Sequence, residues 1–413
     1  MPLLLNIKRI GTPWGGKDAP EGQEKAVRDE FKTGGRFEHG LPGTGDSQLL
    51  FMQHAINKLD DKLGRAAIIS NKSPLFAGGT TSGESQIRRW MLEEDLIEAI
   101  IALPSQLFYN TDIGIYAFIL SKNKRPDRKG KVQLINAVDM WKPLRKSLGK
   151  KRREIDKESM SAIVKLYADF AENKYSKIFP VEEFMYKEYA VYQPLQRKAV
   201  LNSEKIEKIR TSAYFTANSS IFNETEFEEL KEMNPREVKD EKKYQKYIAG
   251  QKFTGDVLSV LEENKSDKVF MDYNEFEKHL KSLLSKGEGF SASRLTGIAM
   301  VLSEIDKTAV VQKDRKGKNI IDVTTKDTET IKLTQDVEEY FKAEVYPHVP
   351  DAMWFYEFDE SKKENTTNKE KKGAEFPFTR FFYEYKAPEK ADDLLKDFME
   401  LEKSLTAKIA ELQ

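Results

Sequence analysis

Residues 96–121 read LIEAIIALPSQLFYNTDIGIYAFILS, and this stretch decides the fold class. Two of its runs, 97–103 and 113–120, are almost wholly apolar and rich in isoleucine. Each run is too short for a typical helix and lacks the helical period, so the pattern predicts two buried strands. The loop between them, residues 104–112, carries two aromatic side chains and an amide, Phe108, Tyr109 and Asn110.

This loop is a candidate binding site, because ligands of open α/β sheets bind outside the strand ends. Pro13 and Trp14, on a turn-rich segment near the N-terminus, add to the same aromatic set. Flat aromatic faces beside polar donors suit a flat heterocycle such as an extruded nucleobase. The alternative is that Phe108 and Tyr109 only seal the loop onto the core, and the residues alone leave both interpretations open.

The segments around this stretch alternate between helical and strand patterns. Apolar residues at steps of three and four predict a helix over 47–63, which Gly64 would end. Residues 65–71 and 131–137 are typical of strands, and 84–94 of a second helix. This alternation indicates an α/β sheet.

The composition limits the chemistry that the chain can perform. The 68 basic residues balance 68 acidic ones, so net charge identifies no partner. The absence of cysteine excludes disulfides, thiolate metal sites and a catalytic thiol, and the four histidines are scattered, which argues against a histidine metal site. No apolar run approaches the roughly 20 residues that span a bilayer, and no signal peptide is recognisable, so we expect a soluble cytoplasmic protein without a membrane partner.

One segment, residues 122–153, concentrates positive charge. It contains thirteen Lys and Arg residues against two acids, Asp127 and Asp139. Such clusters neutralise nucleic-acid phosphates and make binding depend on salt. The alternative is a solvated basic face that balances acidic surface elsewhere.

The remaining segments are less specific. Gly43-Thr44-Gly45 resembles the start of a nucleotide-binding loop, but no strand precedes it, so these glycines are better explained as shaping the entry to the helix at 47. Residues 154–345 are highly charged and mostly helical in pattern, and the polar segment 361–372 is typical of disorder. The last helix carries apolar residues at near-heptad spacing, which suits packing on its own domain or pairing with another chain: Leu394, Phe398, Leu401, Leu405, Ile409 and Leu412.

Several long motifs occur in the order found in one protein family. They are TPWGGKDAPEGQ (12–23), RFEHGLPGTGDSQLLFMQHAI (36–56), GRAAIISNKSPLFAGG (64–79), GESQIRRWMLEEDLIEAIIALPSQLFYNTDIGIYAFILS (83–121), GKVQLINAVDMW (130–141), KSLGKKRREI (146–155) and AEFPFTRFFYEY (374–385). By these motifs the chain resembles the modification (M) subunit of type I restriction-modification systems, a DNA adenine-N6 methyltransferase. The resemblance runs continuously from residue 12 to about residue 200 and returns in the last seventy residues.

The resemblance implies an α/β fold: a partial Rossmann-like class I methyltransferase sheet, then a charged, mainly helical region, then a C-terminal helix. The corresponding parts are residues 1–200, 201–345 and 346–413, the last docking on the specificity (S) subunit. It implies methyl transfer from S-adenosylmethionine to the exocyclic amine of a flipped adenine. The implied partners are DNA, the S subunit and the restriction (R) subunit.

The family's Asn-Pro-Pro-aromatic motif corresponds here to Gly11, Thr12, Pro13 and Trp14. Pro13 and the stacking Trp14 are kept, but the amide that would accept the amine's hydrogen bond is missing. Phe108 matches the family's second base-stacking aromatic, so the implied catalytic residues are Pro13, Trp14 and Phe108. The candidate residues for base and DNA contact are Tyr109, Asn110, Lys129, Arg145, Lys146, Lys150, Lys151, Arg152 and Arg153.

The family's N-terminal domain, glycine-rich cofactor loop and acidic ribose ligand lie upstream of this motif, where the chain has ten unmatched residues. We therefore expect a C-terminal portion of an M subunit that lacks a cofactor site and transfers no methyl group alone. Loss of the first strands would leave residues 65–70 or 3–10 as an exposed sheet edge, which favours self-association or dependence on a partner. The alternatives are a non-catalytic module that binds DNA and the S subunit and, more remotely, an unrelated α/β nucleotide-binding enzyme.

Overall fold

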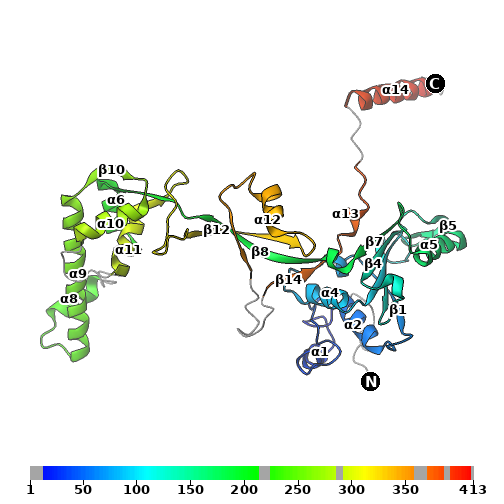
Figure 1. Cartoon of the computed structure of the whole chain (residues 1–413), viewed down its shortest axis with the longest axis horizontal. Helices are drawn as coiled ribbons and strands as arrows, with labels where there is room; N and C mark the ends of the chain where they lie inside the picture. The colour runs from blue at the N-terminus through cyan, green and yellow to red at the C-terminus, as the bar shows by residue number, and fades with distance from the viewer. Residues whose placement is uncertain (1–12, 214–223, 285–291, 358–369, 386–390, 411–413) are drawn as a thin grey trace. The chain divides into compact units, whose positions relative to one another are not determined.

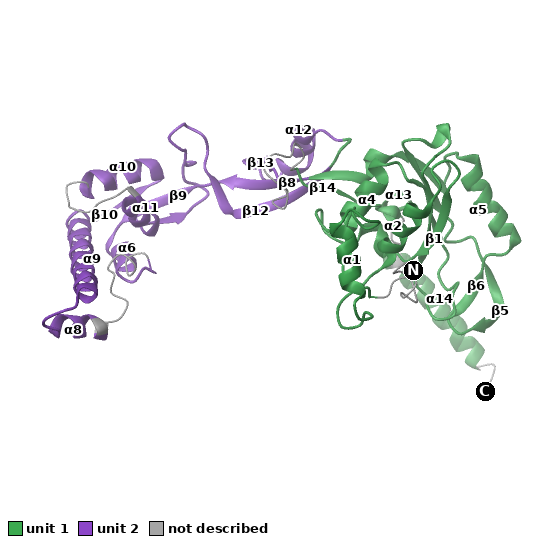
Figure 2. Ribbon diagram, turned by 90° about the horizontal axis from the view of Figure 1, so that it is seen from below, with its two compact units in different colours: residues 1–187, 332–334, 358–413 green, residues 188–331, 335–357 purple. Residues whose placement is uncertain are grey.

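The computed structural model describes residues 13–213, 224–284, 292–357, 370–385 and 391–410. The chain divides into two compact units, drawn in green and purple in Figure 2. Unit 1 comprises residues 1–187, 332–334 and 358–413, and unit 2 comprises residues 188–331 and 335–357. The resemblance predicts three parts, residues 1–200, 201–345 and 346–413, each with its own function. This division by function stays a prediction.

Unit 1 is built on a mixed sheet, which has five strands among the described residues (Figure 1). In spatial order the strands are β1 (Arg65–Ser70), β3 (Ile115–Ser121), β2 (Ile97–Leu103), β4 (Lys131–Asn136) and β7 (Ser176–Pro180). β3 runs antiparallel to both β1 and β2, and β2 runs parallel to β4. The expected α/β class is confirmed, and β1 lies at the edge of the described sheet.

Both faces of this sheet are covered, which explains why its central strands are apolar runs rather than alternating ones. On one face, Ile100 and Phe118 pack with residues of α2 (Gln48–Lys58) and α4 (Gly83–Glu93). On the other face, Ile101 packs with Ile163 of α5 (Lys157–Asp169). All but the last residue of β2 are buried.

The structure corrects two of the predicted boundaries. The helix expected over 47–63 ends at Lys58, because Leu59 turns extended and the Asp60 carboxylate accepts hydrogen bonds from the backbone N–H groups of Lys62 and Leu63. The second strand begins at Ile115 rather than at residue 113, since the two preceding residues belong to the exposed loop. The strand at 97–103 and the helix at 84–94 are confirmed to within one residue.

Smaller elements complete unit 1. They are α1 (Gln23–Lys32), α3 (Ser73–Phe76), η2 (Pro126–Arg128), the hairpin of β5 (Lys142–Leu148) and β6 (Lys151–Glu154), η3 (Val181–Phe184), β14 (Lys372–Ala374), α13 (Phe378–Phe381) and α14 (Ala391–Ala410). The segment after β14 docks on its own chain, because Phe376 and Phe378 are buried in the main core. Arg88 of α4 holds this segment by donating to the Ala374 carbonyl at 2.6 Å.

Unit 2 begins inside β8 (Met185–Pro194), which pairs with β12 (Ile321–Lys332) and β13 (Met353–Tyr356). A second group of elements surrounds a separate apolar core and is mainly helical, as expected. Its members are β9 (Arg197–Leu201), α6 (Ser203–Arg210), α8 (Glu224–Glu232), α9 (Val238–Glu263), β10 (Ser266–Phe270), α10 (Tyr273–Leu284), α11 (Ala292–Val301) and β11 (Ser303–Ile305). The short helices α12 (Val337–Tyr340) and η4 (Phe341–Val345) precede β13.

No helix in the described ranges is both long enough and apolar enough to cross a membrane. Residues 361–369 of the expected linker and Leu412 of the terminal helix lie outside the described residues, so the expectation of disorder there stays a prediction.

Candidate nucleic-acid interface

Three loops of unit 1 meet at one edge of the sheet. β1 and β2 are each antiparallel to β3, and β4 is parallel to β2, so β1, β2 and β4 all point the same way. Their carboxyl ends therefore lie at a common edge, where open α/β sheets bind ligands. The segments that leave this edge are the one after Ser70, the aromatic loop 104–114 and the segment that leads into the β5–β6 hairpin.

The tip of the β5–β6 hairpin docks on the aromatic loop. The Lys150 backbone N–H donates to the Tyr109 carbonyl at 2.9 Å, and the Arg152 N–H donates to the Gln106 carbonyl at 3.1 Å. The backbone of Gln106 has a φ of 62°, a conformation that residues other than glycine rarely adopt. This hairpin was not predicted from the sequence, although its two-residue turn begins with a glycine, Gly149, which is a recognised hairpin signal.

The aromatic side chains of the loop face solvent. Phe108 is 44% exposed and Tyr109 is 59% exposed, and Asn110 beside them is exposed as well. The Lys151 ammonium lies 5.6 Å from the centre of the Tyr109 ring, in the range of a cation–π contact. The two aromatics therefore do not seal the loop onto the core, and the structure brings them together with cations of the hairpin.

The hairpin also carries exposed cations that no described carboxylate neutralises. Among the described residues Arg145, Lys146 and Arg152 are exposed and form no ion pair. Lys150 has only a long contact, 3.6 Å, to the exposed Asp112 carboxylate. Arg153 is used internally, because it stacks 3.9 Å from the Trp141 ring and donates to the Ser105 hydroxyl.

The earlier part of the basic segment lies at the opposite edge of the sheet, where β3 ends and β4 begins. Lys122 pairs with Asp61 at 2.8 Å, and the buried Lys124 pairs with Asp95. Lys129 is exposed but precedes β4, so the structure does not bring it to the hairpin. The basic segment is thus divided into a largely neutralised half at one edge and a free half at the other.

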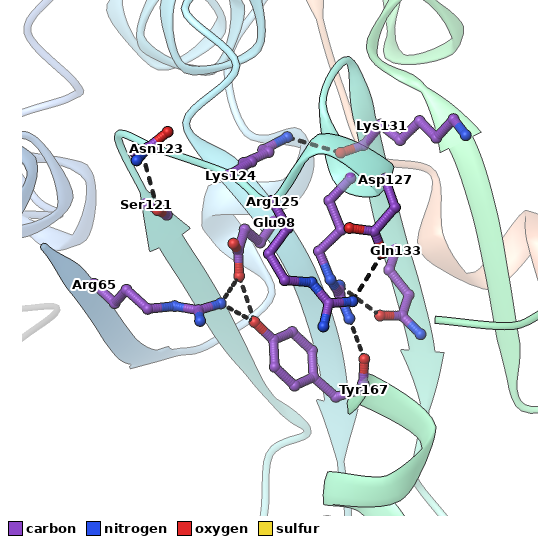
Figure 3. A network of polar contacts seen from close by, with 11 residues as sticks. Arg65, Glu98, Ser121, Asn123, Lys124, Arg125, Asp127, Lys131, Gln133 and Tyr167 are labelled. Carbon is purple, nitrogen blue, oxygen red and sulfur yellow. Dashed lines mark hydrogen bonds and ion pairs between the residues drawn. The ribbon is translucent and has the colours of Figure 1, made fainter. Parts of the chain in front are cut away.

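A buried polar network fixes the neutralised half (Figure 3). The Glu98 carboxylate of β2 is 1% exposed and accepts hydrogen bonds from Arg65 and from the Tyr167 hydroxyl. The buried Arg128 guanidinium stacks 4.4 Å from the Tyr167 ring and donates to Gln133 at 3.0 Å. These side chains join α5 to the sheet, and their charges are satisfied within the protein.

Trp14 is placed differently from the exposed aromatics. Its indole is 1% exposed and packs with Val27, Phe37 and Leu50. Its ring N–H donates to the Gly43 carbonyl at 3.0 Å. A base could stack on Trp14 only after this segment opened, so the predicted roles of Pro13 and Trp14 stay predictions.

The segment Gly43-Thr44-Gly45 serves this packing. The Thr44 carbonyl accepts the backbone N–H of Trp14 at 2.8 Å, and the Gly43 N–H donates to the Glu84 carboxylate at 2.6 Å. The segment therefore ties Trp14 to α4, a contact that the sequence did not predict, and the expected role of these glycines at the entry to the helix at 47 stays a prediction. Gly11 and Thr12 of the matched motif lie outside the described residues.

A cavity of about 580 Å³ opens at the carboxyl edge, between the segment after β1 and the start of β3. Its lining includes Asn71, Lys72, Phe76, Ile113 and Tyr116. S-adenosylmethionine needs a carboxylate for its ribose hydroxyls and a glycine-rich turn, and this lining contains no carboxylate. The cavity does not fit that cofactor, and in the described residues no group of three or more His, Asp or Glu could hold a metal ion.

Comparison with known proteins gives consistent matches. The model of the N-6 DNA Methylase family matches residues 12–247. The type I restriction enzyme MjaVIII methylase subunit of Methanocaldococcus jannaschii is 29% identical over 196 residues, which is 47% of this chain and 32% of that protein. The HindI methylase subunit of Haemophilus influenzae is 35% identical over 102 residues, 25% of this chain and 22% of that protein.

Among solved structures, the type I restriction-modification methyltransferase subunit from Streptococcus thermophilus is 25% identical and has a TM-score of 0.35, covering 42% of this chain and 33% of that one. The chain thus matches about a third of the length of the first of these relatives. The sequence matches confirm the resemblance drawn from the motifs.

Proposed function

The chain belongs to the N-6 DNA methylase family, and from that premise we propose that it is part of a type I modification subunit acting on cytoplasmic DNA. The whole subunit would transfer a methyl group from S-adenosylmethionine to adenine N6. It would work with a specificity subunit, which selects the DNA sequence, and with a restriction subunit. The portion described here would supply the surface that contacts DNA and the helix that docks on the specificity subunit.

One observation carries the proposal for DNA: the free cations and the exposed aromatics share one surface. The hairpin presents Arg145, Lys146 and Arg152, and its tip is hydrogen-bonded to the loop that presents Phe108 and Tyr109. Positively charged side chains bind the phosphate backbone of a nucleic acid, and aromatic rings beside them stack on its unpaired bases.

The terminal helix α14 supports the proposal for a protein partner. The apolar stripe of α14 is not covered by other described residues of unit 1, because its members are each at least half exposed: Leu394, Phe398, Leu401, Leu405 and Ile409. A stripe at these spacings matches the seam of a helical pair. We assign it to the specificity subunit, in keeping with the family.

The second candidate function is a non-catalytic module that binds DNA and the specificity subunit. It is favoured by one observation, the lack of fit between S-adenosylmethionine and the described cavity at the carboxyl edge. Both candidates use the same DNA-contacting surface, and calorimetric titration with S-adenosylmethionine separates them. Micromolar binding supports the catalytic candidate for this chain, and no binding supports the module.

DNA binding through the hairpin is tested by its dependence on salt. The variant R145Q/K146Q/R152Q removes three charges, and K239Q/K242Q/K246Q removes three exposed charges from α9 as a matched control. We expect the hairpin variant to bind duplex DNA more weakly and to lower the slope of log affinity against log salt by about one for each phosphate that the hairpin no longer neutralises. An unchanged slope in the hairpin variant would remove this surface from the proposal.

A further inference from the structure

Two residues that line the cavity at the carboxyl edge carry a polar group with no hydrogen-bond partner within the described part of the chain. The two groups are the amide nitrogen of Asn71 and the hydroxyl of Tyr116. The volume of about 580 Å³ lies within the range of small-molecule sites. The cavity is therefore large enough for a ligand and has hydrogen-bonding groups to orient it.

The orientation of the Asn71 amide follows from its neighbours. The Ser73 backbone N–H lies 2.7 Å from Asn71 Oδ1, and a backbone N–H can only donate, so this atom is the oxygen. The Gln48 amide also donates to Asn71 Oδ1, at 2.9 Å. Gln48 is oriented in the same way, because its own oxygen accepts the Asn71 backbone N–H at 2.8 Å. The Asn71 amide nitrogen is left as a donor for the cavity.

The other walls suit a flat, negatively substituted ligand. Phe76 is 49% exposed, and Tyr116 is partly buried, so both offer ring surface to a planar group. Lys72 at the rim is exposed and brings a positive charge. Ile113 and Gly114 close the cavity from the end of the same loop that carries Phe108 and Tyr109.

We propose that this cavity is a nucleotide-binding site, in which a base lies among Phe76, Ile113 and Tyr116, the Asn71 amide donates to a ring nitrogen or carbonyl, and Lys72 meets the phosphate. The inference rests on the proposed function, because it assigns the cavity to a nucleotide of bound DNA. Asn71 acts as a specificity-determining residue, and Gln48 positions it.

The same cavity chemistry could recognise the adenosine of a cofactor. Two observations favour a nucleotide: the lining has a cation for a phosphate, and it has no carboxylate for ribose hydroxyls. S-adenosylmethionine has no phosphate, and its sulfonium and ammonium outweigh its carboxylate, so its net positive charge disfavours a lining whose one charged residue among those described is Lys72.

The first test is calorimetric titration of the full chain with adenosine 5′-monophosphate, ribose 5-phosphate and S-adenosylhomocysteine. We expect saturable binding of the nucleotide and much weaker binding of the other two, which lack the base or the phosphate. Absence of nucleotide binding overturns the proposal. Tighter binding of S-adenosylhomocysteine than of the nucleotide assigns the cavity to a cofactor and also overturns it.

The second test places the ligand in the cavity. N71D keeps the oxygen that accepts from Ser73 and Gln48 but replaces the amide donor with a negatively charged carboxylate oxygen, and the retained contacts should preserve the fold. We expect nucleotide binding to weaken about tenfold or more, because one hydrogen bond is lost and the new carboxylate repels the anionic nucleotide, with an unchanged unfolding midpoint. The matched control is N173D, because the Asn173 side-chain oxygen also accepts two backbone N–H groups, outside the cavity.

A blocking variant keeps the test independent of Asn71. G114L adds a side chain on the cavity wall, where a Cβ meets open space, and should abolish nucleotide binding. Nucleotide affinity unchanged by both N71D and G114L overturns the proposal. DNA binding that still depends on Arg145, Lys146 and Arg152 would then leave the proposed function standing, whereas loss of that dependence removes both.

Discussion

The backbone N–H of Lys150 donates to the carbonyl of Tyr109 at 2.9 Å, so the basic hairpin and the aromatic loop are held as one surface. Gly149, the residue before Lys150, makes this approach possible. Its φ is 60°, and a Cβ at this position would lie 2.8 Å from the Tyr109 carbonyl oxygen. The chain therefore needs glycine here for both its conformation and its close contact.

Substituting Gly149 should separate the hairpin from the loop. We expect G149A to destabilise the protein by about 1 kcal/mol or more and to weaken DNA binding, because the new Cβ collides with the Tyr109 carbonyl. G130A is the matched control, since Gly130 also has a positive φ, 68°, but a Cβ there meets open space. Chemical denaturation and DNA titration measure the two effects, and equal DNA affinity in the two variants would contradict the expectation.

Arg88 should be required for attachment of the segment after β14. Its buried guanidinium donates to the carbonyls of Ala374 and Ala77 at 2.6 and 2.9 Å, and burial lowers its pKa to about 10. We expect R88M to lower the free energy of unfolding by about 3 kcal/mol, because it leaves buried carbonyls without donors. The neighbouring R89M should change it by less than about 1 kcal/mol. Similar losses in the two variants would refute this account.

Tyr167 should make stability fall at high pH. Burial, with a smaller contribution from the hydrogen bond to Glu98, raises the pKa of Tyr167 from 10.0 to about 12. The unfolded chain therefore loses the Tyr167 proton at a lower pH than the folded chain does. The contribution of this proton to the free energy of unfolding is fully present below pH 10 and is lost as the pH rises toward 12.

The comparison of Y167F with the wild-type chain isolates that effect. Denaturation from about pH 9, roughly one unit below the titration of an unfolded tyrosine, to about pH 12, where the folded group titrates, should show a shallower decline for Y167F. Y175F, a change at an exposed tyrosine, serves as control and should follow the wild type. Parallel curves for Y167F and the wild type would argue against this linkage.

The isolated chain should self-associate. α14 exposes its apolar stripe, and β1 lies at the edge of the described sheet with Ile69 40% exposed. We expect light scattering to detect oligomers, which L401E/L405E should reduce and K403E on the same helix should not. Oligomers that persist in L401E/L405E and disappear in I69K would place the contact at the β1 edge. A monodisperse monomer of the unchanged chain contradicts the prediction.

The purified chain should transfer no methyl group to duplex DNA. The described cavity lacks a ribose ligand for S-adenosylmethionine, and the matched motif has Gly11 in the position of the amine-binding amide. Incubation with methyl-labelled cofactor and adenine-containing DNA should give no labelled adenine. Labelled DNA would show that the chain is a catalyst by itself, and the second candidate function would then be wrong.

The sequence alone determined β1, β2, β3 and β4 of the unit 1 sheet, and the family. The runs predicted at 97–103 and 113–120 correspond to β2 and, from Ile115 onward, to β3, and their apolar composition revealed them because most of their residues are buried between the two covered faces of the sheet. The long motifs identified the methylase relationship in the same way, since they keep both residue type and order. Local signals also located α4 to within one residue.

Only the tertiary structure decided which of the candidate residues lie together. The basic segment is continuous in sequence, yet strand direction sends Lys129 to one sheet edge and Arg152 to the other. Trp14 and Phe108 have similar side chains, but packing buries the first and exposes the second. Exposure and proximity depend on contacts between distant segments, and no local pattern encodes them. The physical reason is that the direction and order of strands in the sheet place each loop.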